Sequence, residues 1–210
     1  SSELKLVKDE YDNVTGGIFD TFGYTKETYI FIASGTTEDR NLNKNAEIMK
    51  IKVMYRTQCL AAYLGYGPDF DVENIGEPTL IISISSTDDQ IPLILKSGEN
   101  KMVAHVEFLM FDDIDTSESI GGMKPMSKND AARIAGTFAQ YNDRVSQIIV
   151  HCDAGYSRSP AVAAALTKAL GEDDSSYFGH GYCPNMHVYR LVLNELAEHG
   201  LLPNCANQVE

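Results

Sequence analysis

Apolar residues recur at helical spacing in two windows of the C-terminal half of the chain. Residues 127–141 present one apolar face, and Ser127 with Asp130 forms the kind of pair that caps the start of a helix. Residues 187–199 present another apolar face, with Asn185 near the expected cap. We therefore predict an amphipathic helix in each window.

Short apolar runs alternate with the helical windows and predict strands. Residues 147–150 contain a continuous apolar run, which is typical of a strand buried on both faces of a sheet. The alanine-rich residues 161–170 favour a helix, which Gly171 is expected to end. Upstream, the pattern predicts strands at residues 50–55, 80–85 and 102–111, and a helix at residues 56–64. Strands that alternate with helices predict an α/β fold with a central, mostly parallel sheet flanked by helices.

The first 45 residues are less regular than the rest of the chain. Residues 28–32 are strand-like, and the polar residues 36–45 are typical of a linker. We treat residues 1–45 as an N-terminal extension of unknown role, and residues 46–210 as the domain that carries the chemistry.

The composition describes an ordinary soluble globular chain of 210 residues, 43% hydrophobic and 22% charged. Lys and Arg number 17 against 30 Asp and Glu, so the net charge of -13 repels a nucleic-acid backbone or an anionic membrane. No apolar stretch approaches the ~20 residues of a membrane-spanning helix, and no signal-peptide pattern is expected. We expect no nucleic-acid partner and no membrane partner.

The cysteines are sparse and show no CxxC spacing; they are Cys59, Cys152, Cys183 and Cys205. This spacing argues against a zinc site, and His180, His187 and His199 show no metal-ligand spacing either, so we expect no metal and no cofactor. So few cysteines favour a reducing, cytoplasmic location.

A segment with the pattern H-C-x5-R-S, from His151 to Ser159, joins the predicted strand to the predicted helix. Such a loop points main-chain N–H groups inward, and the helix dipole adds to their positive field. A phosphate is therefore predicted to bind the N–H groups of Asp153, Ala154, Gly155, Tyr156 and Ser157. The same field lowers the pKa of a thiol that faces it, so Cys152 is predicted to be a thiolate at neutral pH.

The other residues of this segment have matching roles. Arg158 carries a planar guanidinium that can hold two phosphate oxygens at once. Gly155 permits a tight turn, and Ser159 can hydrogen-bond the sulfur and help it to leave phosphorus. His151 is interpreted as an organiser of the loop rather than as a proton shuttle.

Residues 151–160, with the sequence HCDAGYSRSP, resemble the signature loop of the cysteine-dependent protein tyrosine phosphatases, especially of their compact dual-specificity branch. The resemblance extends over about residues 49–202 and is specific only at the loop. It implies that residues 46–210 are a phosphatase domain that hydrolyses phosphomonoesters through a phosphocysteine intermediate.

This family also uses a general acid, an Asp on a loop that follows a strand, to protonate the leaving oxygen. Residues 111–115, FDDID, follow a predicted strand. We favour Asp113, because the family's acid commonly ends such a strand-Asp-Asp segment; Asp115 and then Asp112 are the alternatives. The chain contains no Trp, so the Trp-Pro-Asp loop of the larger tyrosine phosphatases is absent.

Asp153 bears on the substrate. Family members that act on inositol lipids tend to carry lysines in this loop, which has none here. A phosphorylated protein or a small phosphomonoester is therefore the expected partner, with phosphotyrosine favoured. A solvent-facing Asp153 is an equally open alternative. The preference between phosphotyrosine and phosphoserine or phosphothreonine, and the oligomeric state, are left open.

Two other classes of function stay open. One is a catalytically weak phosphate-binding module, because the cradle can bind an anion without a competent acid. The other is a related cysteine-loop enzyme, such as a sulfur transferase or an arsenate reductase. Arsenate reduction needs a resolving thiol, for which Cys183 is the candidate nearest the loop in sequence.

Overall fold

The structure, a computed structural model, describes residues 49–86, 100–179 and 181–203, together with the backbone of three short strands nearer the N-terminus. The chain divides into two compact units, Ser1–Glu47 and Ile48–Glu210. The predicted linker at residues 36–45 lies outside the described residues, and so do His180 and Cys205.

The first unit contains a small antiparallel sheet in the order β1-β2-β3, formed by Leu4–Lys8, Val14–Phe19 and Ile30–Ile32. The last of these strands falls within the segment that the sequence predicts to be strand-like. The first two are not predicted from the sequence. The assignment of residues 1–45 to an extension stays a prediction.

The second unit contains a four-stranded sheet in the order β4-β7-β5-β6, in which every neighbouring pair is parallel. The strands are Lys50–Tyr55 (β4), Thr79–Ser85 (β5), Val103–Met110 (β6) and Gln147–Cys152 (β7). All six residues of β7 are buried, as expected for a central strand of a parallel sheet covered on both faces. The predicted α/β fold is confirmed.

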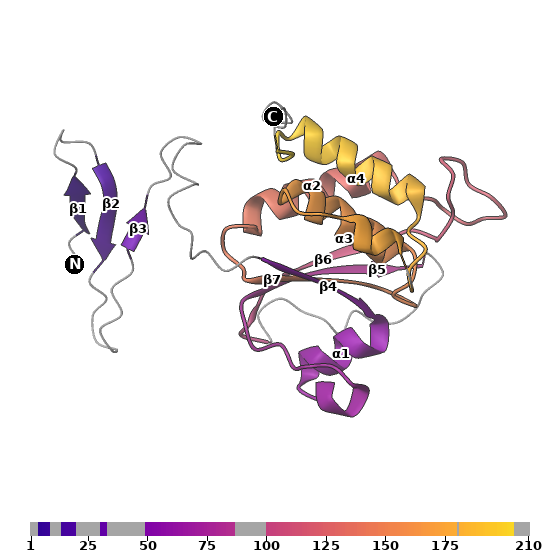
Figure 1. The fold of residues 1–210 in the computed structure, drawn as a ribbon, viewed down its shortest axis with the longest axis horizontal. Helices are drawn as coiled ribbons and strands as arrows, with labels where there is room; N and C mark the ends of the chain where they lie inside the picture. Colours follow the sequence, from indigo (N-terminus) through magenta and orange to yellow (C-terminus); the bar gives the residue numbers. More distant parts are fainter. Residues whose placement is uncertain are drawn as a thin grey trace. The chain divides into compact units, whose positions relative to one another are not determined.

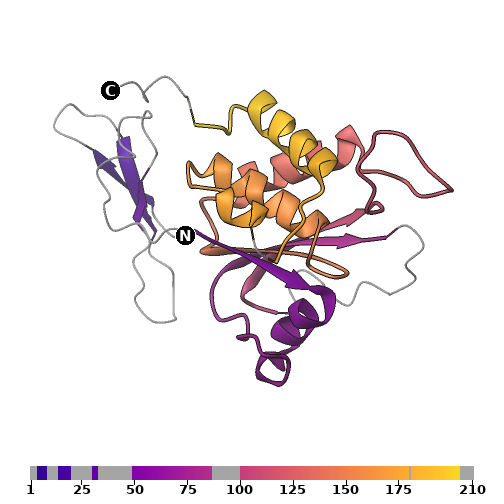
Figure 2. The ribbon, with the colours of Figure 1, turned by 45° about the vertical axis from the view of Figure 1, so that its right-hand side comes forward.

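Helices cover both faces of this sheet (Figures 1 and 2). Helix α1, Arg56–Leu64, lies on one face, and helices α2, Lys128–Tyr141, α3, Arg158–Ala169, and α4, Met186–Glu198, lie on the other. Two short 3-10 helices, Gly67–Phe70 and Ser175–Phe178, complete the unit. In the part of the chain that the structure describes, no helix is long and apolar enough to cross a membrane.

The predicted helix starts agree with the observed caps. Ser127 and Asp130 form a reciprocal capping box, in which each side chain accepts from the other's main-chain N–H. The Asn185 side chain accepts from the N–H of Val188 and so caps α4. Helix α1 has the predicted bounds.

The two faces of the sheet bury different side chains, because successive residues of a strand point to opposite faces. In β7, Ile148, Val150 and Cys152 pack in the larger core beneath α2, α3 and α4, whereas Ile149 packs in the smaller core beside α1. The alternation of β7 therefore places the thiol on the face that α3 covers.

Candidate active site

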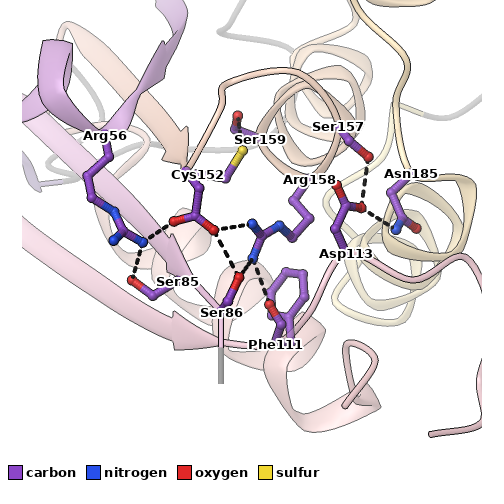
Figure 3. Close-up of polar contacts among 11 residues, drawn as sticks. Arg56, Ser85, Ser86, Phe111, Asp113, Cys152, Ser157, Arg158, Ser159 and Asn185 are labelled. Atoms are coloured by element: carbon purple, nitrogen blue, oxygen red, sulfur yellow. Dashed lines mark hydrogen bonds and ion pairs between the residues drawn. The ribbon is translucent and has the colours of Figure 1, made fainter. Parts of the chain in front are cut away.

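The carboxyl ends of all four parallel strands meet at one edge of the sheet, and each contributes to the candidate site (Figure 3). Arg56 follows β4, Ser86 follows β5, and Asp113 lies shortly after β6. Residues 153–157 form the loop between β7 and α3. Open α/β sheets bind ligands outside the carboxyl ends of their strands, so this is the edge where a ligand is expected.

The thiol lies at the foot of the loop. Cys152 is the last residue of β7 and is only 2% exposed. Its Sγ lies 3.1 Å from the Oγ of Ser159, a buried residue in the first turn of α3. The hydroxyl is therefore placed to donate to the sulfur, as the sequence analysis predicts.

The loop has fixed carbonyls and free N–H groups. The carbonyl of Asp153 accepts from the N–H of Arg56 at 3.3 Å, that of Tyr156 from Cys183 at 2.9 Å, and that of Ser157 from Asn185 at 3.2 Å. By contrast, none of the main-chain N–H groups of residues 153–157 donates to a carbonyl of another described residue. Unpaired N–H groups before a helix N-terminus form a site for an anion.

Gly155 is required by the backbone of this loop. Its φ of +64° lies in the left-handed region, and a Cβ at this position would lie 2.9 Å from the carbonyl carbon of Met54 and from the nitrogen of Tyr55. Both atoms belong to β4, so no side-chain movement relieves the overlap.

Replacing Gly155 with alanine is expected to lower the free energy of unfolding by about 2 kcal/mol or more, because φ strain and a main-chain overlap combine. Gly200→Ala is the matched control: its φ is +67° and the added Cβ has open space. The control is expected to cost about 1 kcal/mol, from φ strain alone. Urea denaturation measures both, and equal losses would show that the contact with β4 has no cost.

Arg158 begins α3 and is 4% exposed. Its Nη1 donates to the carbonyl of Phe111 at 2.8 Å and to the Oγ of Ser86 at 3.2 Å, and its Nη2 donates to the carboxylate of Asp153. Its Nε is buried and has no hydrogen-bond partner among the described residues. A buried, unpartnered donor on a permanent cation is a strong indication of an anion site.

Asp153 turns toward these arginines, so the solvent-facing alternative of the sequence analysis does not describe the structure. One carboxylate oxygen accepts from Arg56, and the other accepts from Arg158 and, at 2.9 Å, from Ser86. Partial burial acts to raise the pKa of this carboxyl, but the hydrogen bond and charge of Arg158, with help from Ser86 and Arg56, hold it below its ordinary value.

The three candidate acids have different hydrogen-bond partners, which distinguish them. Asp113 is exposed, and its Oδ1 accepts from the Oγ of Ser157 at 2.8 Å and from the Nδ2 of Asn185 at 2.9 Å. Asp112 is buried, and its carboxylate accepts from the N–H of Lys124 at 2.7 Å, which closes its own loop. Asp115 accepts from the N–H of His187, in the first turn of α4. Of the three, Asp113 is the one with a described contact to the phosphate-loop segment.

The remaining loop residues differ in exposure. Ala154 and Tyr156 are exposed, Tyr156 by 52%, and their side chains take no part in the contacts described above. His151 is buried, and neither ring nitrogen has a hydrogen-bond partner among the described residues. Burial lowers its pKa to about 4, and the charge of Arg56 acts in the same direction. Burial therefore favours a neutral His151, and its role as an organiser of the loop stays a prediction.

Sequence reasoning missed Arg56 and Ser86. Their signal is positional: each directly follows a predicted strand, and parallel strands end at the same edge. Asn185 was predicted to lie near the cap of α4, where its side chain accepts from the N–H of Val188, and its Nδ2 also donates to Asp113. Within the described ranges, no group of three or more His, Cys, Asp or Glu side chains is arranged to hold a metal ion.

No protein-family model and no curated protein sequence matches the chain. Among solved structures, the chain is similar to two crystal structures of PTPMT1, one of them in complex with PI(5)P. The TM-scores are 0.42 and 0.40 at 14% identity, and the matches cover 71% of this chain and 91% and 90% of the PTPMT1 chains. This similarity concerns the general fold and assigns neither a family nor a substrate.

Proposed function

We propose that the protein is a cysteine-dependent phosphatase that hydrolyses phosphomonoesters through a phosphocysteine intermediate. One observation carries the proposal: a buried thiol lies at the foot of a loop whose free N–H groups, together with the unpartnered Nε of Arg158, lack an acceptor among the described residues. A phosphate supplies the acceptors that these donors need, and it brings its phosphorus to the sulfur.

The reaction has two steps. The Cys152 thiolate attacks phosphorus, the bond to the leaving oxygen breaks, and Asp113 gives its proton to that oxygen. Water then attacks the phosphocysteine, its proton returns to Asp113, and the sulfur leaves as thiolate with a hydrogen bond from Ser159. Inorganic phosphate is released, while the loop N–H groups and Arg158 stabilise the charge of the phosphoryl group in both transition states.

A phosphotyrosyl protein is the substrate class that we favour, with phosphoserine and phosphothreonine as secondary candidates. Two exposed aromatic side chains lie close to the thiol along the backbone: Tyr55, paired in register with Cys152, and Tyr156 in the loop, 39% and 52% exposed. Exposed aromatic side chains next to Cys152 in the chain and in the sheet favour an aryl phosphate. We place this activity in residues 46–210 and in the cytoplasm, with neither a membrane nor a nucleic acid as partner.

The proposal is tested with the wild-type chain and p-nitrophenyl phosphate. We expect steady turnover, and acid quenching during turnover should trap a phosphoryl group on the peptide that contains Cys152, identified by mass spectrometry. Phosphotyrosyl, phosphoseryl and phosphothreonyl peptides of one sequence then rank the substrates. A pure, folded protein that releases no phosphate and forms no adduct would refute the proposal.

The assignment of the acid predicts a dependence on the leaving group. Asp113→Asn is expected to lower kcat for phenyl phosphate on the order of 100-fold, because a phenoxide of high pKa needs a proton as it departs. For p-nitrophenyl phosphate, whose leaving group departs as an anion, the loss should stay within about threefold. Steady-state kinetics on the two esters measure this difference.

Asp115→Asn is the matched control, because it makes the same change on the same loop at a carboxylate that contacts the start of α4. We expect both esters to react at nearly the wild-type rate. A loss in Asp115→Asn with none in Asp113→Asn would transfer the role of acid to Asp115. If neither variant, nor Asp112→Asn, changes the rate on phenyl phosphate, a phosphate-binding module becomes the better description.

A further inference from the structure

The donors of the Arg158 guanidinium can be counted. A guanidinium has five N–H groups. The carbonyl of Phe111 and the Oγ of Ser86 occupy those of Nη1, and Asp153 occupies one of Nη2. Among the described residues, the N–H of Nε and the second N–H of Nη2 are left. These two belong to neighbouring nitrogens of one planar group, which is the arrangement that binds two oxygens of one phosphate.

Asp153 is itself held in place. Arg56 donates to Oδ1, while Ser86 and Arg158 donate to Oδ2. The Ser86 hydroxyl also connects Arg158 to Asp153, because it accepts from Arg158 and donates to Asp153. Apart from Arg158, two donors from two other segments, Arg56 and Ser86, hold this carboxylate, which makes it a rigid support for the arginine that it contacts.

The position of Asp153 also carries an electrostatic cost. Its carboxylate belongs to the first residue of a loop that we propose binds a phosphate dianion, and like charges repel. Arg56, the residue directly after β4, forms an ion pair with this carboxylate and offsets its charge. Arg56 and Arg158 both form ion pairs with Asp153, so two cations offset the charge of this carboxylate beside the loop.

We propose that Asp153 is a positioning residue, which holds Arg158 so that Nε and Nη2 present two N–H groups to the phosphate, and that Arg56 is the counter-charge that makes a carboxylate tolerable there. This inference rests on the proposed function. The rival interpretation is that Asp153 competes with phosphate for Arg158. The two differ in sign: loss of a support weakens anion binding, whereas loss of a competitor strengthens it.

The deciding experiment measures binding without turnover. In the Cys152→Ser background, calorimetry gives the dissociation constant of inorganic phosphate for the parent, Asp153→Asn and Asp153→Ala. An asparagine presents an N–H to one of the two arginines, and an alanine contacts neither. We expect binding to weaken about tenfold in Asp153→Asn and more in Asp153→Ala, in line with the loss of one charge-assisted hydrogen bond. Binding that is unchanged or tighter in Asp153→Asn would overturn the proposal.

Arg56 is tested through a double-mutant cycle in the same background. Arg56→Gln removes one of the two cations that offset the Asp153 charge, so phosphate binding should weaken about tenfold. In Asp153→Asn no carboxylate remains to be neutralised, and the same change should then cost less than about twofold. Arg144→Gln is the control, because Arg144 is an exposed arginine shortly before β7, at the opposite end of that strand from the loop. Equal losses in both backgrounds would show that Arg56 does not act through Asp153.

Two further measurements separate positioning from general instability. Thermal melting identifies variants that are not folded, and Asp153→Asn, which preserves side-chain shape, decides the question if Asp153→Ala does not fold. In the Cys152-containing enzyme, Asp153→Asn should raise KM and lower kcat for p-nitrophenyl phosphate, and the ratio of its rates on phenyl phosphate and p-nitrophenyl phosphate should stay at the wild-type value because Asp113 is intact. A wild type without turnover would refute the proposed function, whereas the calorimetry would still decide the role of Asp153.

Discussion

Cys152→Ser is expected to lower kcat/KM for p-nitrophenyl phosphate by about 10⁴-fold or more, the loss typical of removing a nucleophile. A serine hydroxyl is not ionised at neutral pH, and the structure places no base on this side chain: its described polar neighbour is another hydroxyl, that of Ser159. The loop N–H groups and Arg158 are unchanged, so inorganic phosphate should still bind. Steady-state kinetics measure kcat/KM, and calorimetry measures the binding of inorganic phosphate to the same preparation.

The remaining described cysteines provide controls for this substitution. Cys183 is exposed and its N–H contacts the loop carbonyl of Tyr156, so Cys183→Ser makes the same chemical change beside the site. We expect its phosphatase rate to stay within about twofold of wild type. Cys59 is fully buried in the other core, where burial raises its pKa to about 12 and disfavours a thiolate. Turnover that survives in Cys152→Ser, or that is lost in Cys183→Ser, would contradict the assigned nucleophile.

Arg158→Lys is expected to lower kcat/KM by about 10³-fold, although the charge is kept. An ammonium has three donors at one point, whereas Arg158 contacts Phe111, Ser86 and Asp153 and still has two N–H groups left for phosphate. A lysine ammonium that contacts those partners has no further pair of N–H groups with which to bind two oxygens of the phosphate. The loss should fall on kcat as well as on KM, because the fork also stabilises the transition state.

Arg133→Lys is the matched control for the same replacement. Arg133 lies on α2 and also donates through Nη2 to a carboxylate, Glu107, and to a main-chain carbonyl, Phe108. It lies outside the candidate site, so we expect no change in kcat/KM. A thermal melt of each variant distinguishes a local loss of binding from unfolding. If folded Arg158→Lys lowers kcat/KM by less than tenfold, Arg158 does not stabilise the transition state as proposed.

The parts of the fold that the sequence predicts are those with strong local signals. The capping pair of α2, the cap of α4 and the apolar run of β7 depend on residues a few positions apart. The strand at Val14–Phe19 was not predicted, because the adjacent Gly16 and Gly17 lower its strand propensity. Local pattern therefore identifies elements whose own residues favour them.

The site divides in the same way. The loop from Cys152 to Ser159 is contiguous, so its pattern can be interpreted from the sequence alone. The choice among Asp112, Asp113 and Asp115 cannot, because consecutive side chains point in different directions and only their partners distinguish them. The orientation of Asp153 depends on residues that follow other strands, which no local pattern reports.

The long sequence separation within the arginine cluster has a consequence for fragments of this chain. Arg56 and Asp153 are 97 positions apart, and β4 is an edge strand of the sheet, paired with β7. A truncation that begins after β4 would retain the complete HCDAGYSRSP signature, yet it would expose a side of β7 that is now paired and would remove the main-chain atoms against which Gly155 packs. The signature segment therefore does not define the smallest fragment that folds on its own, because that fragment has to begin before Lys50.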